Sequence, residues 1–195
     1  RFGASQVQAL SNISFSVEEG EYVAIMGESG SGKTTLLNIL AALDQPTDGE
    51  VILNGKKLQS VREKEIAAFR RKHLGFVFQD FNLFPQYTAL ENVTLARRLL
   101  ANSERTGETP EAIRREGEAL LEQMGLGDRM GHYPHQLSGG MLQRLMIAAA
   151  LMCQPSLLVA DEATTAIDAC NRIGLMRELK SFCKEGMSVL FVTHD

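Results

Sequence analysis

The sequence predicts an α/β fold in which a largely parallel sheet is flanked by helices and one purely helical segment is inserted. Three observations support this prediction. Short apolar, β-rich runs recur along the 195 residues, helix-period segments separate several of them, and a glycine-rich loop joins one run to a following helix. With 44% hydrophobic residues, the chain can fill one large domain or a core with an inserted subdomain.

The β-rich runs are predicted to be strands. Two of them, YVAIM at residues 22–26 and LLVAD at residues 157–161, have the continuous apolar character of central strands that are buried on both faces. The other predicted strands lie at residues 13–17, 50–55, 74–79 and 188–195.

The middle of the chain has no convincing strand. Residues 88–100 and 110–125 have helical patterns, and the second pattern has Pro110 near its start and Gly125 near its end, which favours a helix with those limits. The polar stretch between the two patterns, residues 101–109, is predicted to be a mobile linker.

These patterns predict a discontinuous domain organisation. A helical subdomain is expected at residues 81–140, and a discontinuous α/β core is expected at residues 1–80 and 141–195.

Charge and cysteine content exclude several classes of protein. The formal net charge is only −4 and the basic residues are scattered, so we expect no nucleic-acid partner. Cys153, Cys170 and Cys183 have neither the spacing of a zinc site nor the even number of a disulfide framework, and are predicted to be small buried hydrophobes in the reducing cytoplasm. The longest apolar run, residues 145–153, is about half as long as a membrane span, so we expect a membrane to matter only through a partner.

The glycine-rich loop carries the most specific motif. Gly27, Gly32, Lys33 and Thr34 satisfy the pattern G-x-x-x-x-G-K-[ST] between a predicted strand and a predicted helix. Glycines let backbone N–H groups turn toward phosphate oxygens, the lysine reaches the β and γ phosphates, and the threonine hydroxyl can ligate Mg²⁺. The loop is therefore predicted to hold a nucleoside triphosphate. Its predicted contact residues are Gly27, Glu28, Ser29, Gly30, Ser31, Gly32, Lys33, Thr34 and Thr35.

Two neighbouring carboxylates follow the apolar run LLVA. At the end of a buried strand beside a phosphate loop, Asp161 can anchor Mg²⁺, and Glu162 can orient or deprotonate the attacking water. The pair predicts hydrolysis of the bound nucleotide.

A third motif, LSGGMLQRL at residues 137–145, places Ser138, Gly139 and Gly140 ahead of a predicted helix. Such a group of backbone N–H donors with a serine hydroxyl can bind phosphate, but it has no lysine to complete a pocket. Together with GESGSGKT, Gln79 after LGFVF, LLVADE and the terminal FVTHD, this motif resembles the nucleotide-binding subunit of ATP-binding cassette (ABC) transporters over essentially the whole chain.

The resemblance implies a P-loop NTPase (RecA-like) core with an ABC β-subdomain and an inserted α-helical subdomain. It implies an ATPase that uses ATP and Mg²⁺ and forms a head-to-tail homodimer, or a heterodimer with a second ABC ATPase. In that dimer Ser138, Gly139 and Gly140 would close on the γ-phosphate held by the facing subunit, and hydrolysis would release the two subunits. Integral membrane permease subunits are the further implied partners, which would place the protein peripherally on the cytoplasmic side of the cell membrane.

The resemblance also implies roles for single residues. Gln79 would contact Mg²⁺ and the attacking water, and would lie where the membrane subunits contact this protein. His194 would contact the γ-phosphate and position the water together with Glu162. Asp168 would communicate across the dimer, and Phe2 would stack on adenine. The catalytic residues implied are Glu162, His194, Gln79 and Lys33, and the metal ligands are Thr34, Gln79 and Asp161.

The sequence departs from the family pattern in three places. Met141, Ala163 and Ile167 stand where Gln, Pro and Leu are more usual, and the first two replacements occur within the wider family, so activity is still expected. Because the chain begins at the adenine-stacking position and ends one residue after His194, we expect a core shortened at both ends.

The two halves resemble different subgroups. The first half is similar to lipoprotein, macrolide and antimicrobial-peptide export ATPases, and the second half is similar to dipeptide and nickel importers, so substrate and direction stay open, as does a mosaic sequence. The long coiled coil of DNA-repair cassettes, the paired cassettes of translation factors and the lid of P-loop kinases do not occur in the sequence. A non-transport ATPase coupled to a membrane complex, as in cell division, stays open as the alternative function.

Overall fold

The computed structural model describes residues 8–78, 80–161 and 169–193. The strands are β1 (Tyr22–Met26), β2 (Ile52–Leu53), β3 (Lys56–Lys57), β4 (Leu74–Val77), β5 (Leu157–Asp161) and β6 (Ser188–Thr193). The α-helices are α1 (Lys33–Leu40), α2 (Glu63–His73), α3 (Ala89–Glu104), α4 (Pro110–Gln123), α5 (Gly139–Leu151) and α6 (Ala169–Cys183). Short 3₁₀ helices are η1 (Leu58–Ser60), η2 (Gly127–Arg129) and η3 (Pro134–Gln136).

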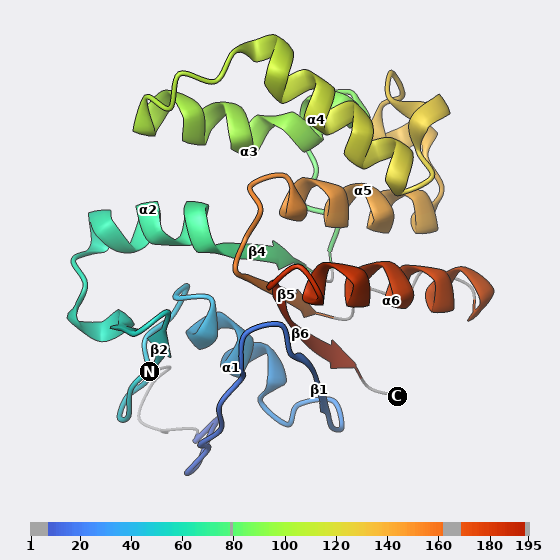
Figure 1. Ribbon diagram of the computed structural model, residues 1–195. Helices are drawn as coiled ribbons and strands as arrows, with labels where there is room; N and C mark the ends of the chain where they lie inside the picture. The colour runs from blue at the N-terminus through green and yellow to red at the C-terminus, as the bar shows by residue number, and fades with distance from the viewer. Residues whose placement is uncertain (1–7, 79, 162–168, 194–195) are drawn as a thin grey trace.

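Four strands form a parallel sheet in the order β1-β6-β5-β4. In Figure 1, α5 and α6 lie above this sheet and α1 lies below it. The alternation of side chains along β5 explains the two layers, because Leu158 and Ala160 join the core cluster that contains α5 while Val159 joins the cluster that contains α1. The predicted α/β fold with a largely parallel sheet is confirmed.

The prediction of two central strands is right for β5 and wrong for β1. Strand β5 lies between β4 and β6, and residues 158–161 are buried. Strand β1 lies at the edge of the described sheet, where it pairs only with β6, and Met26 is 65% exposed. Apolar composition predicted burial correctly only where helices and strands cover both sides of the strand.

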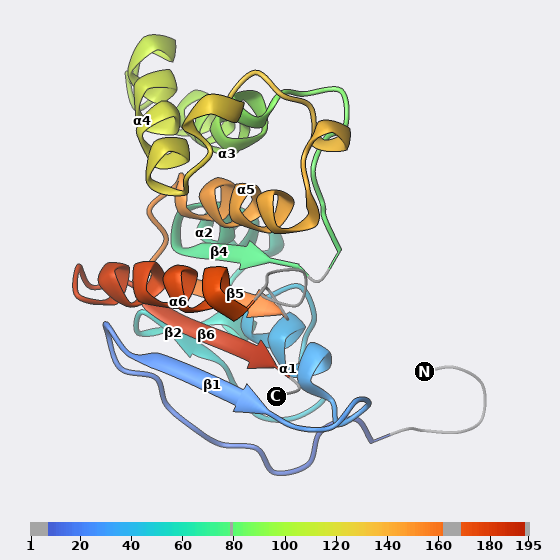
Figure 2. The ribbon, with the colours of Figure 1, turned by 90° about the vertical axis from the view of Figure 1, so that its right-hand side faces the viewer.

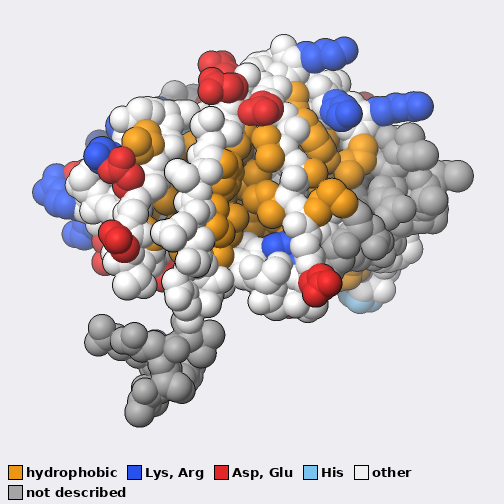
Figure 3. All heavy atoms as spheres, turned by 90° about the horizontal axis from the view of Figure 1, so that it is seen from below, with side chains coloured by type: hydrophobic (Ala, Val, Ile, Leu, Met, Phe, Trp, Pro, Cys, Tyr) orange, Lys and Arg blue, Asp and Glu red, His pale blue; other side chains and the backbone are white. Residues whose placement is uncertain are grey.

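The predicted strand at residues 13–17 is absent from the part of the chain that the structure describes. Its alternating apolar residues have the period of a strand, but a strand also needs a neighbour for its backbone hydrogen bonds, and none of the described strands pairs with it. Ile13 and Phe15 remain about half exposed, and only Val17 packs against the smaller core cluster. Figure 3 looks onto this side from below and shows hydrophobic side chains gathered on its surface.

The predicted strand at residues 50–55 becomes a short hairpin. Strands β2 and β3 pair in an antiparallel manner around Asn54 and Gly55, whose φ angles of 49° and 74° are those of the turn that two-residue hairpins prefer. The single predicted run therefore contains one short strand and the turn that ends it.

The two predicted helices of the middle segment are confirmed as α3 and α4. Thr88 and Thr109 cap their first turns, and Pro110 occupies the first turn of α4. Helix α3 continues to Glu104, so the predicted linker begins at Arg105, four residues later than expected. Both helices pack against α5, above the sheet in Figure 1.

A glycine allows α5 to approach the sheet closely. A Cβ atom on Gly75 in β4 would lie 2.8 Å from the backbone oxygen of Ala150 and 3.0 Å from Pro155 Cγ. Because α5 begins at the Ser-Gly-Gly motif, this contact also fixes where that motif lies relative to the sheet.

The predictions about cysteines and membrane spans can be compared with the structure only for the described residues. Cys153 and Cys183 are free thiols and only half-buried, less than the predicted burial, and Cys170 has no described side chain. Among the described residues, no helix combines the length and the apolar character needed to cross a bilayer.

His73 lies at the junction of α2, β4 and the β2–β3 hairpin. Its Nδ1 atom is 3.3 Å from Ser156 Oγ and 3.4 Å from Asn54 Nδ2. Burial lowers the pKa of His73 below its ordinary value, the positive charges of Lys72 and Lys56 lower it further, and Glu104 opposes them. The folded protein therefore favours the neutral imidazole more strongly than the unfolded chain does.

We expect this histidine to make stability depend on pH. Its contribution to the free energy of unfolding should be complete above the unfolded pKa of 6.5 and should decrease as the pH falls toward the lower folded pKa. Urea unfolding at a series of pH values from about 5.5 to 8, on both sides of the ordinary histidine pKa, would measure it. A His73→Asn variant should lose this part of the slope, and an unchanged slope in that variant would contradict the assignment.

Candidate nucleotide-binding site

The predicted phosphate loop joins the carboxyl end of β1 to the start of α1. Gly32 is the N-cap of α1, with φ of 90°, and neither a side-chain cap nor an acidic residue is present in the first helical turn. The backbone N–H groups at this end are therefore not capped by a side chain. In α3, by contrast, Thr88 and Glu91 form a capping box. A helix end of this kind favours an anion.

Position 32 requires glycine for two reasons, the positive φ angle and the lack of room for a Cβ atom. A Cβ atom there would lie 2.6 Å from the oxygen of Ala9 and 2.9 Å from Leu10 Cδ2. Gly30 also has a positive φ, of 80°, but a Cβ atom on Gly30 would meet nothing within 4 Å. The loop thus packs closely against the chain at Gly32 and is open at Gly30.

Lys33 turns back into the loop and is only 8% exposed. Its Nζ donates to the oxygens of Gly27 and Glu28, both at 2.6 Å, and to Ser31 Oγ at 3.3 Å. No ion pair within the described ranges involves Lys33, and the printed acceptors of its ammonium are neutral oxygens, two of the backbone and one hydroxyl. The ammonium has three protons, and the longest bond can be exchanged for a phosphate oxygen while the two short bonds hold the group in place.

Asp161 ends β5 on the side of the sheet that faces α1. It is buried, and its Oδ2 lies 3.4 Å from the hydroxyl of Thr34 in the first turn of that helix. A hydroxyl and a carboxylate are the oxygen ligands that Mg²⁺ accepts beside substrate phosphates and water. No cluster of three or more His, Cys, Asp or Glu side chains suited to a metal occurs in the described ranges.

The Ser-Gly-Gly motif begins α5, on the opposite face of the sheet from α1. Ser138 is the N-cap, and its Oγ accepts a bond of 3.4 Å from the backbone N–H of Met141. Arg144, one turn later, donates to the oxygens of Gly140 and Met124 and fixes the first turn to the end of α4. The starts of α1 and α5 both lie toward the right of Figure 2, but in different layers.

The structure therefore groups some predicted residues and separates others. It brings Lys33, Thr34 and Asp161 together at the phosphate loop, and it keeps Ser138 with its two glycines apart from them in the same chain. Glu28, Ser29, Gly30 and Ser31 lie in the loop as predicted, and Thr35 lies in the first turn of α1. Five predicted site residues lie outside the described ranges: Phe2, Gln79, Glu162, Asp168 and His194.

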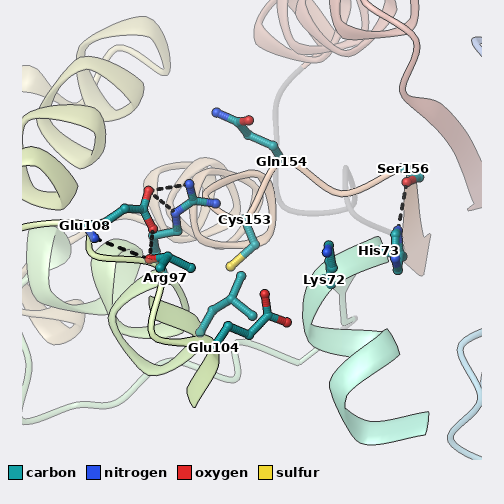
Figure 4. A pocket seen from close by; sticks show the side chains of 10 residues that line it. Lys72, His73, Arg97, Glu104, Glu108, Cys153, Gln154 and Ser156 are labelled. Atoms are coloured by element: carbon teal, nitrogen blue, oxygen red, sulfur yellow. Dashed lines mark hydrogen bonds and ion pairs between the residues drawn. The ribbon is translucent and has the colours of Figure 1, made fainter. Parts of the chain in front are cut away.

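A hollow of about 500 Å³ that the sequence did not predict lies at the amino ends of β4 and β5, at the edge of the sheet away from the phosphate loop. Its walls include Lys72, Arg97, Glu104 and Glu108, and Arg97 pairs with Glu108 (Figure 4). Burial raises the pKa of the Cys153 thiol at its wall. With acidic and basic groups balanced, this hollow does not have the charge of a phosphate site.

Comparison with known proteins assigns the fold to a family. The family model described as "ABC transporter" matches residues 10–165. The uncharacterized ABC transporter ATP-binding protein MJ1508 of Methanocaldococcus jannaschii is 48% identical over 194 residues, which are 99% of this chain and 84% of that protein. The macrolide export ATP-binding/permease protein MacB of Rhodopirellula baltica is 46% identical, and the alignment covers 100% of this chain but only 28% of MacB.

A solved structure is also similar. The dimeric post-hydrolysis state of the ATP-binding cassette MJ0796, bound to ADP and Pi, matches with a TM-score of 0.93 and 41% identity over 100% of this chain and 84% of that one. The P-loop NTPase type of α/β fold is thereby confirmed.

The different surroundings of the two loop glycines can be tested by alanine substitution. We expect Gly32→Ala to lower the free energy of unfolding by about 2–3 kcal/mol, because it combines a strained φ with a clash against the backbone, and Gly30→Ala by about 1 kcal/mol from the strained φ alone. Urea unfolding of both variants measures the difference. Equal effects would show that the contact of Gly32 with residues 9–10 does not constrain the loop.

Proposed function

We infer that this chain, which belongs to the ABC transporter family, is the ATP-binding and ATP-hydrolysing subunit that powers a membrane transporter. The observation that supports this function best is the buried ammonium of Lys33 in the loop between β1 and α1, beside the Thr34–Asp161 pair. A buried cation that is solvated only by neutral oxygens favours an anionic ligand at that place. The macrolide export relative is named for both ATP binding and a permease, which supports transport over the alternative, a non-transport ATPase coupled to a membrane complex.

We propose that the loop holds the phosphates of ATP through its backbone N–H groups and Lys33. Thr34 and Asp161 hold Mg²⁺, which when bound neutralises phosphate charge. Gln79 is a further proposed ligand. For the reaction, Glu162 orients or deprotonates the attacking water, Gln79 and His194 position that water, and Phe2 stacks on adenine; these roles rest on the family resemblance.

The complete site requires two chains. Helices α1 and α5 lie on opposite faces of the sheet, so the cap at Ser138 lies away from the phosphate loop of its own chain. We propose that Ser138, Gly139 and Gly140 meet the γ-phosphate of a facing subunit in a head-to-tail dimer, with Asp168 at the contact between the subunits. The dimeric state of the related cassette supports such an arrangement, and the second chain is either a copy of this one or a second ABC ATPase.

The membrane partner follows from the family. The macrolide export relative is named as an ATP-binding/permease protein, and the proposal places this chain on the cytoplasmic side of the cell membrane through contact with permease subunits. We propose residues 81–140 as a helical subdomain that leads into the Ser-Gly-Gly motif, and residues 1–80 and 141–195 as the discontinuous ATP-binding core.

Lys33 gives the first functional test. We expect Lys33→Ala to weaken the binding of ATP about tenfold or more, because charge-assisted hydrogen bonds contribute about 1.5–3 kcal/mol each. Titration with a fluorescent ATP analogue measures the affinity, and Lys64→Ala, which removes an exposed lysine from α2, is the matched control. An affinity of the Lys33 variant within twofold of the wild type would contradict the assignment.

Ser138 tests the composite site. We expect Ser138→Arg to keep ATP affinity within about twofold while hydrolysis falls about a hundredfold or more, because the altered cap belongs to the site of the facing subunit. Steady-state hydrolysis should be measured over a range of protein concentrations beside ATP binding, with the exposed Ser60→Arg as control. Full hydrolysis by the Ser138 variant alone at every concentration would rule out the two-chain site.

A further inference from the structure

Asn92 is a buried polar residue in the first turns of α3 that the roles described above do not use. It is 6% exposed, and its side chain makes four hydrogen bonds to backbone atoms outside the regular helix pattern. Its Oδ1 accepts from the N–H of Phe84 at 2.8 Å, and its Nδ2 lies 3.1, 3.0 and 3.0 Å from the oxygens of Phe84, Tyr87 and Thr88.

These bonds fix the turn that precedes α3. Among the described residues of the connection from β4 to α3, the backbone bonds are short-range, from Leu83 to Phe81 and from Tyr87 to Phe84; Leu83 packs against the core, whereas Phe84 remains 47% exposed. The Asn92 amide nitrogen donates to carbonyl oxygens of residues 84–88, and the Phe84 and Thr88 oxygens also accept backbone N–H bonds, so removal of the side chain deprives chiefly the N–H of Phe84 and the oxygen of Tyr87. Asn92 is therefore the link that holds this turn against α3.

The same end of α3 holds the segment that leads to Ser138. The N–H of Ala89 donates to the oxygen of His132 at 2.8 Å, and the N–H of Leu90 donates to the oxygen of Met130 at 3.0 Å. Residues 133–137, which include η3, then connect His132 to the cap of α5. Figure 2 shows the segment before α3 and the segment before α5 running beside each other at the upper right.

We propose that Asn92 is a positioning residue for the two-chain ATP site. By holding residues 84–88 on the first turn of α3, it keeps the N–H groups of Ala89 and Leu90 aligned with residues 130–132, and so keeps Ser138 where it can reach the facing subunit. This inference rests on the proposed two-chain site. It assigns Asn92 no contact with ATP, because the phosphate loop lies on the other face of the sheet.

The test separates nucleotide binding from association of the two chains. The variant Asn92→Ala removes all four bonds, and Asn92→Ser is a milder second variant whose short side chain can bond only within its own helix. The matched control is Thr94→Ala, because Thr94 is equally buried on the same helix but donates to the oxygen of Leu90 within that helix. Association should be measured by sedimentation with a non-hydrolysable ATP analogue, and binding by titration of the monomer.

We expect both Asn92 variants to bind the analogue within about twofold of the wild type, while the dissociation constant of the analogue-bound dimer rises about tenfold or more. Hydrolysis should fall at low protein concentration and recover partly at high concentration. Thr94→Ala should lose a similar amount of thermal stability but associate as the wild type does. If Asn92 had a purely structural role, the Asn92 and Thr94 variants would instead show the same dimer dissociation constant at the same loss of thermal stability.

The outcomes also distinguish this inference from the function on which it rests. If Ser138→Arg blocks association but the Asn92 variants associate like Thr94→Ala, the positioning role is wrong and the two-chain site stands. If Ser138→Arg itself associates and hydrolyses normally, the two-chain site is wrong, and the positioning role of Asn92 is overturned with it.

Discussion

The site depends on one buried cation. The ammonium of Lys33 is held by two short bonds to backbone oxygens at the start of its own loop, so the loop is curled around the charge. Because neutral oxygens surround the cation, an anion that enters the loop meets a charge that is already desolvated and oriented. The closely packed Gly32 lets the backbone pass from this curl directly into α1.

The alternation of side chains in the central strands decides what lies near that cation. In β5, residues 158 and 160 pack toward α5, and residue 159 packs toward α1, so Asp161 follows on the side of α1 and reaches Thr34. A register shift by one residue would place this carboxylate on the other face. The same alternation puts the Ser138 cap in the opposite layer, so a single sheet separates the two helix ends that are proposed to bind phosphate.

Local features of the site could be predicted from the sequence, and features that depend on distant segments could not. The loop between β1 and α1 and the place of Asp161 beside it could be predicted because each motif occupies consecutive residues whose chemistry is specific. The strand at residues 13–17 was wrongly predicted, and β1 was wrongly placed in the sheet centre, because period and composition do not reveal which neighbours a strand has. Asn92 was missed because one asparagine within a helical pattern gives no signal until the turn that it binds is known.

The separation of the two helix ends gives a physical reason why binding and hydrolysis would be coupled to association. The loop around Lys33 holds its own cation and can bind phosphate within one chain, whereas the Ser138 cap offers N–H groups without a cation and gains little from a phosphate by itself. In the proposed two-chain site, each part would be completed by its complement from a second chain. At the start of α3, Asn92 binds the segment before that helix, and the N–H groups of Ala89 and Leu90 bind the segment that leads to α5. A force applied to the turn at residues 84–88 would therefore be transmitted to the Ser138 cap. A membrane partner that contacts this turn would then act on association of the two chains rather than on the affinity of either chain for ATP.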